Sequence, residues 1–335
     1  MRVGVIGGGS WGTALARELA NKNIDTKIYI RNKDQYETMK EYHINKRYLA
    51  DVILPESLKL TNDLDECILD KDFLILAVPT SSVRSLMENL SGKISKDVIL
   101  VNVAKGIEVK TLKRISEIVS EFFPENKFVA LSGPTHAEEV AIDFPSTIVA
   151  ASENLEAAEK TQNLFMSDTL RVYTNDDLLG VELAGALKNI IALANGILVG
   201  LGYGDNSRAA LMTRGLAEIT RLGKAMGAQE ATFLGLTGVG DLIVTCTSEH
   251  SRNRTCGKYI GQGMKVEEAI EKVGMVVEGI KTTASTVELA KKYKVDMPIA
   301  TALYEVIYEG ADVKDIVTRL MSRSKKHEID GYFRG

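Results

Sequence analysis

The feature that most constrains the fold is a glycine-rich turn close to the start of the chain. Residues 2–6 are short, apolar and rich in β-branched side chains, which is typical of a strand buried on both faces. Residues 13–19 are rich in Ala and Leu and are typical of a helix. Between them, Gly7, Gly9 and Gly12 match G-x-G-x-x-G. In this context the glycines permit a tight turn, close approach of a pyrophosphate and close helix–strand packing, so the pattern predicts a dinucleotide-binding domain. The alternative is a glycine turn without a ligand.

The end of the next predicted strand, residues 26–30, bears on which dinucleotide is bound. An acidic side chain is expected about 20 residues after the glycines, where it accepts from the ribose hydroxyls of NAD. This chain has Arg31, Asn32 and Lys33 instead. A cation at this place suits a 2′-phosphate and predicts that NADP(H) is at least accepted. Solvated charges after a strand remain the alternative.

The order of the predicted elements indicates two domains. Strand-like segments alternate with helical ones up to about residue 175, which predicts a doubly wound, mainly parallel sheet. Beyond Asp176 the strand signals largely stop, and residues 178–201 form a long apolar segment with small side chains. We therefore expect an α/β Rossmann domain over residues 1–177 and an all-α domain over 178–335. The further strands are expected at 58–60, 73–78, 98–101, 128–131, 147–150 and 171–173, with helices at 81–89, 112–122, 155–165, 209–226, 266–272, 283–293 and 300–308.

Composition limits the partners and the compartment. The 335 residues are 45% hydrophobic and 26% charged, and the net charge of −4 argues against a nucleic-acid binder. Three cysteines form no disulfide framework, and a strand beginning near Met1 leaves no room for a signal peptide, so a cytoplasmic location is expected. Lys188 and Asn189 interrupt the longest apolar run, which argues against a membrane span. No regular zinc-ligand spacing is present among Cys246, His250 and Cys256, so no metal is expected.

Three charged residues are candidates for acid–base chemistry. Lys188 lies inside the long apolar segment, where burial would lower the pKa of its ammonium toward a useful range. The alternative is a lysine whose ammonium reaches solvent at the helix edge. Lys105 directly follows a predicted strand, at the sheet edge where ligands bind, although a lone lysine there is often a surface charge. Asp241 follows glycines in Gly238-Val239-Gly240, where a plain turn residue is the alternative.

Two further segments suit a phosphorylated ligand. Ser251, Arg252 and Asn253 combine hydroxyl, guanidinium and amide donors, although an isolated run of this kind is also typical of a solvated loop. Gly133 and Thr135 follow another predicted strand and offer backbone and hydroxyl donors. The spacing of Thr135 and Glu138 is also that of a helix capping box, which would account for both residues structurally.

Together these segments resemble the bacterial type of NAD(P)-dependent glycerol-3-phosphate dehydrogenase. The resemblance runs over nearly the whole chain in the order and spacing of that family. The segments that carry it are 7–16, 102–108, 132–141, 180–195, 235–247 with 251–254, and 274–283. Asn32 is a departure, because a second basic residue is common there, and it weakens the expected discrimination for the 2′-phosphate. Thr255 and Cys256 also depart from the family pattern but lie outside the matched site.

The resemblance implies reversible hydride transfer between NAD(P)H and dihydroxyacetone phosphate, giving sn-glycerol 3-phosphate for phospholipid synthesis, in a homodimer. It implies Lys188 as the proton acceptor. The chemistry then suits Lys105 to stabilising the developing oxyanion, and Asp241 either orients Lys188 or only contacts the substrate. The implied cofactor contacts are Ser10, Trp11, Arg31, Tyr48, Lys105, Ala137, Arg252, Val276 and Glu278. The implied substrate contacts are Lys105, Gly133, Thr135, Lys188, Asp241, Ser251, Arg252 and Asn253.

Two other functions compete with this interpretation. A dehydrogenase acting on 3-hydroxy acids also uses a helix-borne lysine, but it needs a carboxylate site where this chain offers Ser251, Arg252 and Asn253. A non-catalytic NADP-binding sensor would keep the glycine turn and Arg31, yet it has no use for Lys105, Lys188 and Asp241 together.

Overall fold

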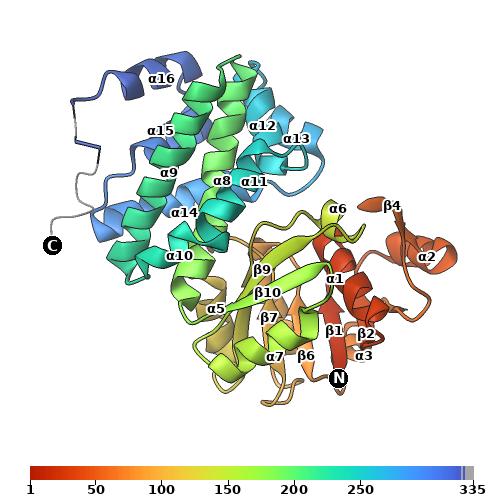
Figure 1. The fold of residues 1–335 in the computed structure, drawn as a ribbon. Helices are drawn as coiled ribbons and strands as arrows, with labels where there is room; N and C mark the ends of the chain where they lie inside the picture. The colour runs from red at the N-terminus through yellow and green to blue at the C-terminus, as the bar shows by residue number, and fades with distance from the viewer. Residues whose placement is uncertain (326, 329–335) are drawn as a thin grey trace.

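The computed structural model describes residues 1–325 and 327–328 and has two lobes (Figure 1). The N-terminal lobe contains an eight-stranded sheet in the order β10-β9-β8-β7-β6-β1-β2-β5. All neighbours in it are parallel except β8 and β9. The mainly parallel α/β domain predicted from the sequence is confirmed. The strands of the sheet are β1 (Arg2–Ile6), β2 (Asp25–Tyr29), β5 (Lys59–Thr61), β6 (Phe73–Leu76), β7 (Ile99–Asn102), β8 (Phe128–Ser132), β9 (Ser146–Ala151) and β10 (Leu170–Asn175).

Helices cover both faces of this sheet, and the alternation of side chains along each strand explains why. Val3 and Val5 on β1 belong to one buried apolar cluster, whereas Ile6 belongs to a second. A strand with apolar side chains on both faces must be covered on both faces. The covering elements are α1 (Ser10–Asn21), α2 (Lys33–Tyr42), α3 (Leu64–Ile68), the 3₁₀ turn η1 (Thr80–Ser82), α4 (Val83–Leu90), α5 (Ile115–Phe122), α6 (Ala137–Val140) and α7 (Leu155–Phe165).

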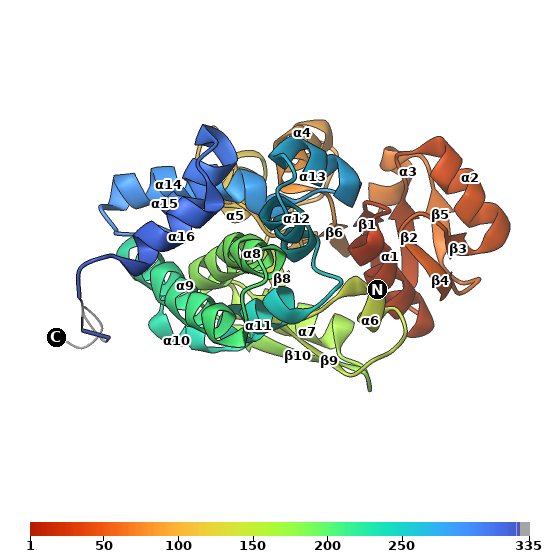
Figure 2. The ribbon, with the colours of Figure 1, turned by 90° about the horizontal axis from the view of Figure 1, so that it is seen from above.

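The C-terminal lobe is helical and surrounds α8 (Leu178–Gly200), as Figure 2 shows from above. Helix α8 is long and apolar enough to cross a membrane, but 89% of its apolar window is buried inside the protein, as in a core helix. The other elements of this lobe are α9 (Asp205–Met226), α10 (Glu230–Leu234), the π-helical turn η2 (Leu236–Gly240), α11 (Asp241–Thr247), α12 (Arg252–Gly261), α13 (Val266–Val273), α14 (Glu278–Tyr293), α15 (Pro298–Tyr304), the π-helical turn η3 (Glu305–Glu309) and α16 (Val313–Met321).

Helices α8 and α12 contact each other backbone to backbone. A Cβ added at Gly196 of α8 would lie 2.0 Å from the carbonyl oxygen of Arg254 on α12. A Cβ added at Gly257 of α12 would lie 2.0 Å from the carbonyl oxygen of Leu193 on α8. Neither position has room for a larger residue. The glycines therefore fix the start of α12 beside the middle of α8.

Several sequence expectations differ from the structure. Helices α11 and α12 were not predicted, because α11 is short and directly follows the glycines of η2, and α12 has the glycines and polar side chains typical of a loop. Helix α14 begins at Glu278, earlier than the expected residue 283. The small hairpin of β3 (Ile44–Asn45) and β4 (Leu49–Ile53) was missed because its strands are short and show no regular alternation of apolar and polar side chains. The basic end of the chain, residues 323–327, is typical of a solvated tail, and its described residues are indeed exposed, with Arg323 in a surface ion pair with Asp296. Lys326 lies outside the described residues.

Candidate active site

The glycine turn between β1 and α1 leaves open space where a pyrophosphate is expected. Gly7 has φ of +126°, and a Cβ there would lie 2.3 Å from the carbonyl oxygen of Ala77. A Cβ at Gly12 would lie 2.1 Å from the carbonyl oxygen of Gly7, whereas a Cβ at Gly9 would meet nothing within 4 Å. No side chain caps the N-terminus of α1. The turn is therefore tight at the first and third glycines and open at the second, which fits the phosphates of a dinucleotide.

The other cofactor candidates lie around this turn. Trp11 is half-buried and packs in one apolar cluster with Ala137 at the start of α6. Arg31 is exposed just after β2, and Tyr48 is half-buried in the connection between β3 and β4. Val276, before α14, is 42% exposed.

Two contacts join the helical lobe to the nucleotide lobe beside the turn. The guanidinium of Arg252 donates from Nη2 to Ser10 Oγ over 2.7 Å. Thr80 donates its backbone N–H to Glu278 Oε1 over 3.1 Å. Burial raises the pKa of the Glu278 carboxyl, although the Thr80 N–H partly offsets this effect. The first residues of α12 and α14 thus meet the carboxyl ends of the central strands, where ligands of such sheets bind.

A buried cluster of two ammonium groups and one carboxylate lies between the lobes. Lys188 on α8 donates from Nζ to Asp241 Oδ1 and, over 2.5 Å, to Thr245 Oγ1. Lys105, just after β7, donates from Nζ to Asp241 Oδ2 over 2.7 Å and to the Gly133 carbonyl oxygen over 3.0 Å. The side chains of Lys188 and Asp241 are only 8% and 2% exposed. Each lysine uses two of its three N–H donors here, which leaves one for a ligand.

The charges of the cluster perturb one another. Burial lowers the pKa of Lys188 to about 8, because a buried ammonium loses hydration. The Asp241 carboxylate opposes this fall, and the Lys105 ammonium adds to it. Burial also acts to raise the pKa of Asp241, but the two ammonium groups outweigh it and hold that pKa below its usual value. A lysine with such a pKa can both give and accept a proton near neutral pH.

Thr245 is a member of the cluster that sequence reasoning missed. Its hydroxyl donates to the Asp241 carbonyl oxygen over 2.6 Å, one turn earlier in α11, and accepts from Lys188. A threonine four residues after Asp241 could have been noticed only once a helix was expected there. The predicted capping box at Thr135 and Glu138 is absent: α6 begins at Ala137 without a side-chain cap, and Thr135 Oγ1 donates to the Gly133 carbonyl oxygen over 3.2 Å.

The polar segment expected as a phosphate site forms the start of α12. Ser251 is the N-cap residue, and its hydroxyl accepts from the Arg254 N–H. Asn253 is buried, donates to Asn189 Oδ1 over 3.0 Å and accepts from the Gly279 N–H over 2.8 Å. The solvated-loop alternative is therefore wrong, since Asn253 and Arg254 are 9% and 6% exposed. Asn253 keeps one amide N–H beyond the bond to Asn189, and Arg252 lies beside it.

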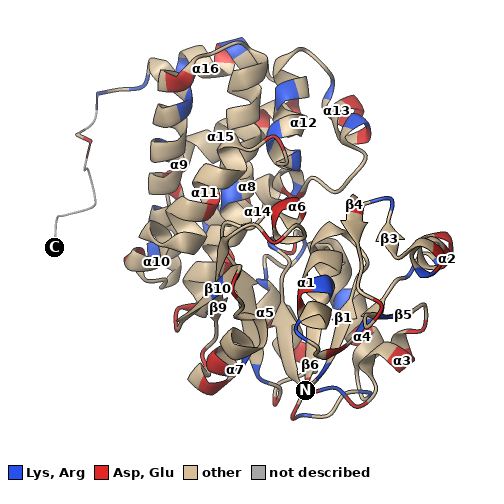
Figure 3. Cartoon of the chain, turned by 45° about the vertical axis from the view of Figure 1, so that its right-hand side comes forward, with Lys and Arg blue, Asp and Glu red and all other residues tan. Residues whose placement is uncertain are grey.

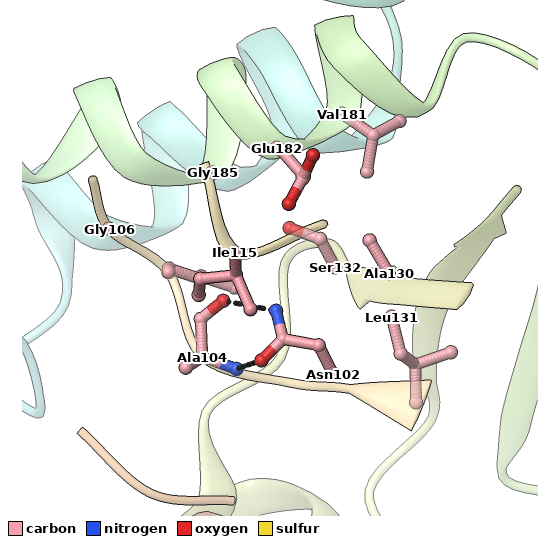
Figure 4. A pocket seen from close by; sticks show the side chains of 11 residues that line it. Asn102, Ala104, Gly106, Ile115, Ala130, Leu131, Ser132, Val181, Glu182 and Gly185 are labelled. Atoms are coloured by element: carbon pink, nitrogen blue, oxygen red, sulfur yellow. Dashed lines mark hydrogen bonds between the residues drawn. The ribbon is translucent and has the colours of Figure 1, made fainter. Parts of the chain in front are cut away.

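Behind Lys105 is a cavity of about 10 Å³, between the ends of β7 and β8 and helix α8 (Figure 4). Ser132 Oγ points toward Glu182 in it and has no hydrogen-bond partner among the described residues. Asn102 holds the nearby chain by accepting from the Ala104 N–H over 3.1 Å and donating to its carbonyl oxygen over 2.9 Å. This volume is that of one water molecule, so the base of the site is closely packed.

A nucleotide turn that faces a buried lysine–carboxylate cluster across two lobes defines a nicotinamide-dependent oxidoreductase. The family models for the N-terminal and C-terminal parts of NAD-dependent glycerol-3-phosphate dehydrogenase match residues 2–158 and 177–318. The chain therefore belongs to the NAD-dependent glycerol-3-phosphate dehydrogenase family, and its cofactor is NAD(H) or NADP(H).

Individual relatives agree with the family models over nearly the full length. The chain is 52% identical to a glycerol-3-phosphate dehydrogenase [NAD(P)+] of Lysinibacillus sphaericus, covering 98% of each. It is 51% identical to the Clostridium perfringens protein of that name, covering 98% of this chain and 99% of the relative. A crystal structure of glycerol-3-phosphate dehydrogenase from Coxiella burnetii superposes with a TM-score of 0.93 at 34% identity, covering 96% of this chain and 99% of that one.

Proposed function

We propose that this protein catalyses the reversible reduction of dihydroxyacetone phosphate to sn-glycerol 3-phosphate. The observation that carries the proposal is the buried cluster of Lys188, Asp241 and Lys105, in a protein whose helical lobe also contacts the nucleotide turn through Arg252 at the cationic start of α12. When bound, NAD(P)H supplies the hydride. The chain supplies the proton, the charge stabilisation and the orientation of the substrate.

Lys188 is the proton donor for reduction. Reduction of a ketone needs one hydride at carbon and one proton at oxygen, and the free N–H of Lys188 Nζ is the source of that proton. Lys105 stabilises negative charge on the same oxygen, because its ammonium is held close to Lys188 by the shared Asp241 carboxylate. In the oxidative direction neutral Lys188 accepts the proton from the alcohol. Asp241 orients both ammonium groups.

Arg252 holds the substrate phosphate, with Ser251 and Asn253 beside it. A guanidinium presents paired N–H donors that match two phosphate oxygens. Arg252 also donates to Ser10 on the nucleotide turn, so its side chain lies within reach of both ligands. Gly133 and Thr135 lie next to Lys105 and contact the substrate there. Binding of the phosphate orients the carbonyl toward the hydride donor.

The test is a substrate panel with a matched pair of variants. We expect oxidation of NADPH or NADH with dihydroxyacetone phosphate, far less with dihydroxyacetone, and none with 3-oxo acids. Lys188→Ala should lower kcat by roughly 10²–10⁴ while nucleotide affinity is nearly unchanged. The control is Lys160→Ala, which removes a lysine exposed on α7 and paired with Glu156. Preference for a 3-oxo acid, or normal kcat in folded Lys188→Ala, would contradict the proposal.

We also propose the wider setting of this activity. The domains are residues 1–177 and 178–335, which agrees with the end of β10 at Asn175 and the start of α8 at Leu178. Cys67, Cys246 and Cys256 are free and buried, which suits the cytoplasm. The product serves phospholipid synthesis, and the protein is a homodimer. Light scattering on the purified chain measures its mass directly, and a monomer would refute the last proposal.

A further inference from the structure

A second cleft lies at the far end of the nucleotide lobe, between the first turns of α2 and the connection from β3 to β4. Its volume is about 280 Å³, slightly less than that of a typical small-molecule site, so it suits part of a nucleotide. Figure 3 shows basic residues on the β3–β4 connection beside it. The lining residues are Asn32, Asp34, Gln35, Thr38, Lys46 and Arg47.

This cleft is tied directly to the glycine turn. The carbonyl oxygen of Gly8 accepts from Gln35 Nε2 over 2.5 Å and from Asn45 Nδ2 over 3.0 Å. Asn45 is fully buried and also donates to Thr13 Oγ1 over 2.8 Å. Gln35 lines the cleft, and Asn45 directly precedes Lys46. A ribose joined to a pyrophosphate at the turn therefore lies within reach of the cleft.

The cationic side chains of the cleft have no acidic partner. Within residues 1–325 and 327–328, no carboxylate pairs with Lys46 or Arg47. Their cations instead lie 3.1 Å and 5.3 Å from the ring centroids of Tyr42 and Tyr48. Asn32 is neutral, and its Oδ1 is occupied by the Gln35 N–H over 2.8 Å. The positive charge of the lining therefore comes from the β3–β4 connection.

We propose that Lys46 and Arg47, together with Arg31, bind the 2′-phosphate of NADP(H) in this cleft. Asp34 is the one carboxylate in the lining, and it opposes a phosphate while favouring a free 2′-hydroxyl. The preference between the two cofactors is then set by opposite charges on the two sides of the cleft. This inference rests on the proposed use of NAD(P)H.

The test compares two nucleotide fragments on the full-length protein. Isothermal titration with 2′,5′-ADP and with ADP measures how much the 2′-phosphate adds to binding. Lys46→Ala and Arg47→Ala should each weaken 2′,5′-ADP by about two- to fivefold, the upper part of the range for solvent-exposed charge pairs, and leave ADP affinity nearly unchanged. Asp34→Asn should tighten 2′,5′-ADP. The loss of 2′,5′-ADP affinity in Lys46→Ala and Arg47→Ala should be smaller at high salt, because salt screens exposed charges.

Lys40→Ala is the matched control, since Lys40 lies on α2 over the Tyr36 ring, at 5.8 Å from its centroid, outside the lining. It should change neither affinity. Equal weakening of both nucleotides, an effect no larger than that of Lys40→Ala, or no tightening in Asp34→Asn would overturn the inference. Turnover of dihydroxyacetone phosphate by the unaltered protein is measured separately, so failure of the proposed reaction is distinguished from failure of the cleft.

Discussion

Replacing Asp241 with Asn tests how the buried cluster controls proton transfer. Asp241 places one carboxylate oxygen on Lys188 and the other on Lys105. Asn keeps the shape but removes the charge that supports the ammonium form of Lys188. The pKa of Lys188, about 8 in the native cluster, should therefore fall. Removing an opposite charge at such short range lowers a pKa by about 1–3.

The expected fall in the reduction rate follows from the fraction of Lys188 that is protonated. At pH 7.5 a group with a pKa near 8 is roughly three-quarters protonated, whereas a fall of about 2 leaves roughly 3%. Reduction of dihydroxyacetone phosphate should thus slow about 25-fold at this pH from protonation alone. Because the lost step is protonation, part of the rate should return toward pH 6.

The assay is the pH dependence of kcat for reduction, from pH 5.5 to 9. In Asp241→Asn the alkaline limb should move to lower pH by about 2. Thr245→Val is the control, because it removes a neutral partner of Lys188 and no charge. Its alkaline limb should stay close to that of the unaltered protein. A limb that stays in place or moves upward in folded Asp241→Asn would refute the electrostatic role of this carboxylate.

Two further predictions concern binding and stability. Arg252→Lys should raise KM for dihydroxyacetone phosphate by roughly tenfold or more, because an ammonium cannot replace a bidentate guanidinium, and equal penalties on dihydroxyacetone would contradict the assignment. Glu218 is 2% exposed, accepts from the N–H groups of Ile299 and Ala300, and has its pKa raised to about 7, chiefly by burial. Its contribution to stability is complete below the unfolded pKa near 4.5 and is lost as pH rises to 7, by about 3 kcal/mol. Urea unfolding should show this loss in the unaltered protein and not in Glu218→Gln, and parallel pH profiles would show that Glu218 does not cause it.

The sequence predicted the sheet and the long apolar helix well, since both depend on local patterns. Residues 2–6 and 178–201 carry apolar periodicity and small residues that allow few other structures. Glycine spacing likewise indicated the nucleotide turn. Lys188 was singled out by its apolar surroundings, and the structure places it on Asp241, whose other carboxylate oxygen accepts from Lys105.

The missed features depend on contacts between distant segments. Asn253 and Arg254 are polar and were compatible with a loop, but they are buried because α12 packs against α8. Thr245 joins the cluster only through the helical spacing of α11. The β3–β4 hairpin is held through Asn45, whose partners Gly8 and Thr13 lie far earlier in the chain. The pattern of a single sequence does not show which distant segments contact each other.

The glycine contact between α8 and α12 bears on the size of molecule that this site selects. Lys188 and Arg252 lie on these two helices, and at Gly196 and Gly257 the backbones touch without intervening side chains. The spacing of the two backbones that carry Lys188 and Arg252 is therefore set by main-chain contact, which yields far less than a layer of side chains can by repacking. In the proposed mechanism, a phosphorylated ketone with one carbon more between carbonyl and phosphate then has to be accommodated by the Lys188 and Arg252 side chains alone. The backbone contact between α8 and α12 thus makes the length of the substrate, besides its charge, part of the proposed substrate choice.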